Sequence, residues 1–100
     1  MELLQLRYFK ELAESEHLTN TAKKLMISPP SLSLTISKLE AELGTPLFDR
    51  VGRNLRLNDY GKDFYKYIRK GLASIDKGTQ EISERLKLVK ATLNIAIASP

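Results

Sequence analysis

Apolar side chains recur at helical spacing near the start of the chain. Spacings of three and four residues place them on one helix face, and charged or polar residues fill the positions between. The apolar positions are Leu6, Phe9, Leu12 and Ala13. We therefore expect a first amphipathic helix over residues 2–13, ended by the polar residues at 15–17.

A shorter helical pattern follows and predicts a second helix from Thr19 to Leu25. Thr19 is the expected N-cap, because its side-chain oxygen can accept a hydrogen bond from a free N–H group of the first turn. Ala22 and Leu25 face inward in this helix. The small side chain of Ala22 allows another helix to approach closely.

The third predicted helix carries signals at both of its ends. Ser28 is the expected N-cap, and Pro29 and Pro30 occupy the first helical positions, where missing N–H groups cost little. Gly44 is the expected C-cap. One apolar stripe is predicted to face the core, formed by Leu32, Ile36, Leu39 and Leu43.

A basic β-hairpin is predicted after the third helix. Two short stretches, 47–50 and 54–57, have strand character and are joined by a turn at Val51, Gly52 and Arg53. In the second strand the leucines point inward and Arg56 points outward. Two helices with a tight turn and a basic hairpin behind them are typical of a winged helix-turn-helix.

A long helix is predicted to follow the hairpin. Asn58 is its expected N-cap, Asp59 complements the helix dipole in the first turn, and the pattern continues to about Lys90, which gives a length of about 45 Å. A heptad seam runs along it, formed by Tyr65, Ile68, Leu72, Ile75, Thr79, Ile82, Leu86 and Val89. Such a seam needs a second surface, so we expect a homodimer.

The final residues, 93–98, alternate between apolar and other positions and are expected to form a strand at the start of a further domain. The predicted organisation is a DNA-binding domain at 1–58 with its helix-turn-helix at about 18–37, a dimerisation helix at 59–90, and the truncated domain at 91–100. The expected fold is mainly α: three helices and a two-stranded wing, followed by the long helix.

Charge and composition narrow the possible partners. The chain has 16 Lys and Arg residues against 12 Asp and Glu, and its net charge of +4 favours a polyanionic partner such as nucleic acid. With no cysteine and one histidine, His17, neither a metal site nor a disulfide is expected, and His17 is most simply a surface loop residue. The absence of a signal peptide or a long apolar run predicts a cytoplasmic protein that does not enter the membrane.

Small polar residues dominate the outward face of the third helix. At about 100° per residue, Leu34 and Ser37 lie opposite the buried Leu32. Serine is a mediocre helix former, so a cluster suits contact with phosphates and base edges, although it also fits an ordinary solvent-facing helix. The candidates for contact with DNA are Thr19, Ser28, Ser31, Ser33, Leu34, Thr35, Ser37, Lys38, Arg50 and Arg53.

The chain resembles the N-terminal part of LysR-type transcriptional regulators over essentially its whole length. The matching positions are Leu6-Arg7-Tyr8-Phe9, Leu18-Thr19, Ala22, Leu25, Ile27-Ser28, Pro30, Leu32-Ser33, Ile36, Leu39-Glu40, Leu43-Gly44, Leu47-Phe48, Arg50, Arg53, Leu57 and Gly61. The resemblance implies a bacterial regulator that binds DNA as a dimer or tetramer. It also implies an effector-binding domain that begins near Leu93 and senses a small molecule.

Two positions depart from the pattern of that family. Members usually carry glutamine and arginine as base-reading residues where this chain has Pro29 and Leu34. Those two contacts do not transfer, so sequence readout is expected to rest on other residues.

Two functions other than a DNA-binding regulator are open to this sequence. The heptad seam also fits a coiled-coil protein-interaction module with a structural head, and a steep loss of affinity with salt would distinguish DNA binding from it. An enzyme is the weakest interpretation, because the sequence has no paired His and carboxylate, no phosphate-binding glycine loop and no metal spacing. No cofactor is expected.

Overall fold

The computed structural model describes residues 1–98, with side chains through Asn94. The elements in order are α1 (Leu3–Ser15), α2 (Leu18–Lys24), α3 (Pro29–Leu43), β1 (Phe48–Val51), β2 (Asn54–Leu57) and α4 (Asp59–Ala98). Two compact units are distinguished, residues 1–69 and the part from Lys70 onward. We call the first unit the head and the β1–β2 hairpin the wing. The architecture is mainly helical with one two-stranded sheet, as the sequence predicted.

The first two helices meet at a tight junction. A capping box between Glu2 and Gln5 starts α1, and Glu16 ends it in the left-handed conformation. The expectation that Thr19 caps α2 is wrong, because α2 begins at Leu18 with His17 at the N-cap. The turn is instead organised by Ser15, whose hydroxyl accepts from the His17 N–H at 3.1 Å.

The capping signals of α3 are confirmed. The Ser28 Oγ accepts from the Ser31 N–H at 3.2 Å, the two prolines occupy the first two positions, and Gly44 ends the helix with φ 84°. The inward stripe is correct at Leu32, Ile36 and Leu39, which are buried. Leu43 is an error, since it is 37% exposed in the last turn, where the chain already turns away toward Gly44.

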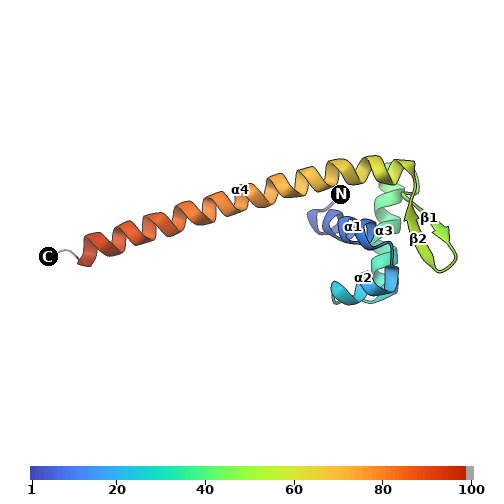
Figure 1. Cartoon of the computed structure of the whole chain (residues 1–100), viewed down its shortest axis with the longest axis horizontal. Coiled ribbons are helices and arrows are strands. Elements are labelled where there is room, and N and C mark those ends of the chain that lie inside the picture. The colour runs from blue at the N-terminus through green and yellow to red at the C-terminus, as the bar shows by residue number, and fades with distance from the viewer. Residues whose placement is uncertain (99–100) are drawn as a thin grey trace. The chain divides into compact units, whose positions relative to one another are not determined.

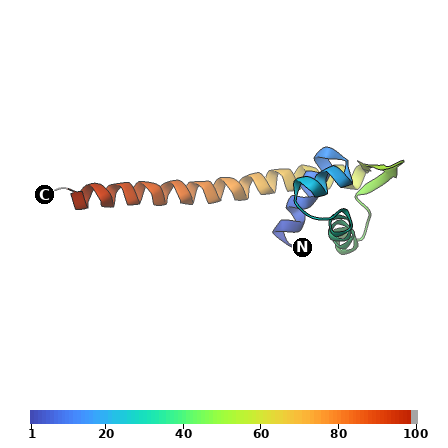
Figure 2. The same cartoon turned by 90° about the horizontal axis from the view of Figure 1, so that it is seen from below.

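The wing is an antiparallel hairpin in which Phe48 pairs with Leu57 and Val51 pairs with Asn54. The first strand therefore begins and ends one residue later than predicted, and Val51 belongs to the ladder rather than to the turn. Leu55 and Leu57 are half-buried against the core, while Arg56 is exposed. In Figures 1 and 2 the tip of the hairpin points away from α1, α2 and α3.

The core of the head lies where α1, α2 and α3 meet the base of the wing (Figure 1). Phe9 is fully buried, with its ring centroid 5.7 Å from that of Phe48 and 5.1 Å from that of Phe64. Asn58 joins the start of α4 to the base of the wing, since its N–H donates to the Leu47 carbonyl at 3.0 Å. Its Oδ1 accepts from the Gly61 N–H at 2.8 Å and caps the helix. The predicted N-cap at Asn58 is thus confirmed.

Helix α4 is longer than the sequence pattern indicated. It has 40 residues, equivalent to about 60 Å of helix, and continues through Ala98. The predicted strand at 93–98 is therefore wrong, and residues 99–100 of the expected last segment lie outside the described residues. A strand needs a neighbour for its backbone groups, whereas a helix satisfies them internally. Among the described residues the only sheet is the β1–β2 hairpin, so this stretch has no strand to pair with.

Hydropathy along the helices bears on membrane association. Among the described residues, no helix combines the length and apolar character that crossing a lipid bilayer requires.

Gly61 marks the closest approach of α4 to the base of the wing. A Cβ atom at this position would lie 2.1 Å from the Leu47 carbonyl oxygen and 2.8 Å from Leu57 Cδ2. Because the nearer atom belongs to the backbone, no side-chain rotation relieves the overlap. Gly71, farther along the same helix, has no described atom within 4 Å of such a Cβ.

We predict that Gly61→Ala lowers the free energy of unfolding by about 2 kcal/mol or more, because the backbone of α4 must move away from Leu47. The matched change Gly71→Ala should raise it by up to about 1 kcal/mol, through the better helix propensity of alanine. Urea denaturation of both variants at one protein concentration measures the difference. Equal stability of the two variants would contradict this account.

Candidate nucleic-acid interface

The outward face of α3 is displayed as the helical spacing predicted. Leu34 is 56% exposed, and Ser31, Ser37 and Lys38 are exposed as well. The buried stripe on the opposite side of the helix packs into the core of the head. The helix therefore presents the short side chains of Ser31 and Ser37, together with Lys38, around one apolar residue, Leu34.

A shallow groove of 170 Å³ separates α3 from the wing. Its lining includes Ser33 and Ser37 from α3 and Arg50 and Arg53 from the wing. Four of the predicted contact residues thus meet in one place although they come from separate elements. Asn54, which the sequence interpretation missed, lines the same groove next to Arg53. Its signal was its position directly after the turn of a basic hairpin.

Thr35 and Lys38 lie on a different side of α3. Both line a cleft of 370 Å³ shared with Gln5 and Tyr8 of α1. The Thr35 hydroxyl donates to the Ser31 carbonyl at 2.9 Å, and the Thr35 carbonyl accepts from Gln5 Nε2 at 3.2 Å. The structure therefore does not bring these two residues into the groove with the wing arginines.

The remaining polar candidates lie near the starts of α2 and α3. The Ser28 hydroxyl donates to the Ser31 hydroxyl at 2.8 Å while accepting from the Ser31 N–H. Both serines are exposed, and so is Thr19 in the first turn of α2. Ser28 has a structural role as a cap in addition to its accessibility.

Two carboxylates fix the wing relative to the helices. Glu40 of α3 accepts from the Leu47 N–H at 2.6 Å, just before β1. Glu16, at the junction of α1 and α2, accepts from the Leu57 N–H at 2.9 Å in β2. The base of the wing is closed by Asn58, whose Nδ2 donates to the Pro46 carbonyl at 2.8 Å. Hydrogen bonds to β2 and to the residues that flank the hairpin therefore hold the base of the wing that carries Arg50 and Arg53.

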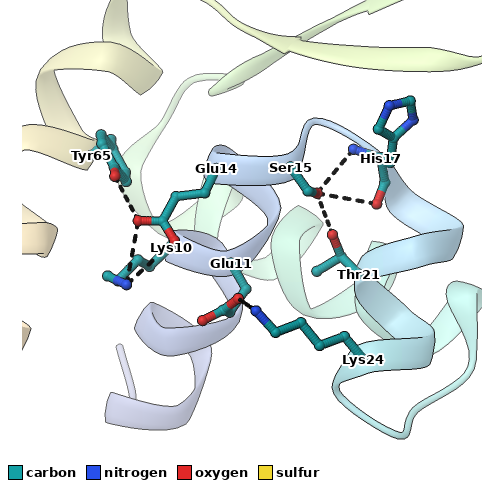
Figure 3. Close-up of polar contacts among 8 residues, drawn as sticks. All are labelled: Lys10, Glu11, Glu14, Ser15, His17, Thr21, Lys24 and Tyr65. Atoms are coloured by element: carbon teal, nitrogen blue, oxygen red, sulfur yellow. Dashed lines mark hydrogen bonds and ion pairs between the residues drawn. The ribbon is translucent and has the colours of Figure 1, made fainter.

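A polar network connects α1 with α2 and with the start of α4 (Figure 3). The Tyr65 hydroxyl donates to Glu14 at 2.7 Å, which lowers the pKa of the Glu14 carboxyl and raises the pKa of Tyr65. The Lys24 ammonium lies 2.7 Å from Glu11, and this hydrogen bond raises the pKa of Lys24. Ser15 also forms a short hydrogen bond with Thr21. These contacts tie α2 and the beginning of α4 to α1.

The predicted heptad seam divides into two parts. Tyr65 and Ile68 belong to the head and pack against its core. Leu72 is 3% exposed, whereas the seam residues that follow are exposed. The exposed part consists of Ile75, Thr79, Ile82, Leu86 and Val89. Leu93, which the sequence interpretation placed in a strand, extends this spacing by four residues and is also exposed.

The described acidic side chains and His17 do not gather into a cation site. Among the described residues, no three His, Asp or Glu side chains are placed to hold one.

The head is a winged helix-turn-helix domain, with three helices, of which α3 is capped and has an exposed outward face, and a basic two-stranded wing. Residues 3–62 match the family model described as "Bacterial regulatory helix-turn-helix protein, lysR family". The chain belongs to this family.

Curated relatives agree with that assignment. The chain is 45% identical over 87 residues to the uncharacterized HTH-type transcriptional regulator YybE of Bacillus subtilis, covering 87% of this chain and 30% of that protein. It is 41% identical over 99 residues to the HTH-type transcriptional regulator BudR of Klebsiella aerogenes, covering 99% of this chain and 69% of that protein. The chain thus spans less than a third of the length of YybE.

A solved structure shows the same fold. A crystal structure of the DNA-binding domain of BenM in complex with catB site 1 DNA has a TM-score of 0.78 and 38% sequence identity. The similarity covers 87% of this chain and 96% of that one. The family and the winged helix-turn-helix fold predicted from the sequence are therefore confirmed.

Proposed function

We propose that this chain binds double-stranded DNA as a homodimer and regulates transcription in a bacterial cytoplasm. The observation that carries the proposal is the groove in which Ser33 and Ser37 of α3 meet Arg50 and Arg53 of the wing. Short hydroxyl side chains can approach bases and phosphates, and two guanidinium groups beside them suit the DNA backbone or the minor groove. The solved complex of the similar BenM domain with DNA supports DNA binding by this fold.

The proposed geometry places α3 in the major groove and the wing on the backbone or in the minor groove. A two-fold dimer would present two such helices to an interrupted palindrome, with half-sites separated by whole turns of the duplex. Of the other candidate contacts, Lys38 would bind a phosphate. Contacts to phosphates or base edges would come from Thr19, Ser28, Ser31 and Thr35. Because α3 reads the bases in this arrangement, sequence preference should depend on its outward face.

The dimer interface is proposed to lie on the seam of α4, chiefly on its exposed part from Ile75 to Val89. Since the chain spans less than a third of YybE, a longer protein would add the effector-binding domain, which would bind a small molecule and permit a tetramer. The boundaries proposed for that arrangement are 1–58 for DNA binding and 59–90 for dimerisation.

Salt dependence tests DNA binding itself. The affinity for duplex DNA should fall steeply with salt, and Arg53→Ala should flatten the logarithmic slope by about one and weaken specific and random duplexes by a similar factor. Arg85→Ala, a change of the same charge on α4, is the control and should leave the slope unchanged. A mobility shift at several salt concentrations measures both. Binding to a protein partner with no affinity for DNA would instead favour the coiled-coil interaction module.

The dimer seam is tested by burying a charge in it. Ile82→Asp should weaken dimerisation on the order of 100-fold and, through lost bivalency, reduce DNA affinity. Gln80→Asp places the same side chain on the opposite face of α4, where it should leave the dimer intact. Light scattering across a concentration series reports the assembly. A monomeric parent, or a fully dimeric Ile82→Asp variant, would refute the seam.

Leu34 gives a prediction about base preference. Its exposed side chain cannot donate hydrogen bonds to guanine but can pack against the C5-methyl group of thymine, so A·T pairs should be preferred beneath it. Leu34→Ala should cost on the order of 1 kcal/mol at the preferred site and little on random DNA, while Leu34→Arg should shift the preference toward guanine. Binding-site selection decides. Identical preferences for all three proteins would assign specificity to the serines, the wing or DNA shape.

A further inference from the structure

Glu16 has an unusual backbone for its residue type. Its φ of 59° and ψ of 19° lie in the left-handed region, which a side chain with a Cβ disfavours and a glycine adopts freely. Such a conformation persists where the surrounding structure holds it, and it often marks a position that does something a relaxed residue would not.

The contacts of Glu16 show what holds it. Its N–H donates to the Leu12 carbonyl at 2.8 Å, which closes the end of α1. Its carbonyl oxygen accepts from the Leu55 N–H at 3.2 Å. Its side-chain Oε2 accepts from the Leu57 N–H at 2.9 Å. One residue therefore supplies two acceptors to the same strand, one from the backbone and one from the side chain.

The two donors are alternate residues of β2. In an antiparallel pair, alternate N–H groups point toward the neighbouring strand and the others point away from it. Leu55 and Leu57 are two positions apart and both donate to Glu16, so Glu16 covers the edge of β2 that faces away from β1. It takes the place of a third strand. A glycine would relax the backbone but would leave the Leu57 N–H without the carboxylate acceptor.

We propose that Glu16 is a positioning residue for DNA binding: its carboxylate holds β2 against the α1–α2 junction and thereby sets the place of Arg50 and Arg53 beside α3. This inference rests on the proposed function, in which the wing contacts DNA. Glu40 holds the start of β1 from α3 itself, so the two carboxylates fix the wing from two different helices. Glu16 does not need to touch DNA for this role.

Three variants separate positioning from stability. Glu16→Gly releases the backbone strain but also removes the acceptor of the Leu57 N–H, and because these two effects oppose each other the urea midpoint should stay close to that of the parent. DNA affinity should fall about tenfold. Glu16→Gln keeps an acceptor oxygen and should stay within about twofold of the parent affinity. Glu11→Gln removes the same charge from α1 at a residue that bonds Lys24 rather than the wing, and it should not weaken binding.

Amide hydrogen exchange by NMR supplies a readout that does not require DNA. Exchange of the Leu57 N–H should be about tenfold faster in Glu16→Gly than in the parent, and close to the parent rate in Glu16→Gln. If Glu16 only stabilised the fold, Glu16→Gly and Glu16→Gln would each lower the urea midpoint and the DNA affinity together.

Three results would overturn the proposal: parental DNA affinity in Glu16→Gly, an affinity loss that tracks lost stability in both variants, or unchanged exchange at Leu57. If the parent itself fails to bind duplex DNA, the proposed function and the positioning role are both refuted. Leu57 exchange then reports only whether the carboxylate holds the strand. If the parent binds duplex DNA and Glu16→Gly binds it with the same affinity, only the positioning role is refuted.

Discussion

The contact of the Phe9 ring with Phe48 and Phe64 joins three parts of the head that are far apart in the sequence. Phe9 comes from α1, Phe48 from the first strand of the wing and Phe64 from α4, with ring centroids 5.7 and 5.1 Å from that of Phe9. Aromatic rings bury a large apolar area and prefer such tilted arrangements. The base of the wing and the start of α4 therefore pack against the same ring of α1.

Polar contacts then fix orientation, which apolar packing alone leaves adjustable. Glu40 and Glu16 each accept a hydrogen bond from a backbone N–H of the wing region. Charged acceptors make stronger hydrogen bonds than neutral ones. Without these carboxylates the two N–H groups would have to find water as an acceptor at a half-buried edge. The groove between α3 and the wing keeps its shape because its two walls are connected by bonds as well as by the core.

The sequence predicted those features that depend on local chemistry. These features act on residues only a few positions away: the cap at Ser28, the prolines after it, the glycine that ends α3 and the cap at Asn58. Errors occurred where neighbours in space decide. His17 rather than Thr19 is the N-cap of α2, because Ser15 organises the turn. The stretch at 93–98 is helical, because an alternating pattern specifies a strand only beside another strand.

The candidate interface shows the same difference between features set by the local sequence and features set by neighbours in space. Periodicity identified the exposed face of α3, since burial of Leu32 fixes where Leu34 and Ser37 point. It gave no means to separate Ser33, which lies in the groove with the wing, from Lys38, which lies in the cleft toward α1. That distinction depends on which elements flank each side of the helix. The role of Glu16 was equally hidden, because its partners are far along the chain.

The start of α3 has a further consequence for how this domain meets a charged surface. Helix N-termini commonly attract anions through free N–H groups, but here Pro29 and Pro30 have none, the Ser31 N–H is bonded to the Ser28 side chain, and the Leu32 N–H is bonded to the Ser28 carbonyl. The first turn of α3 therefore offers no unpaired backbone N–H group to an anion. If the chain binds DNA as proposed, contacts to the phosphates must come from side chains rather than from the first turn of α3.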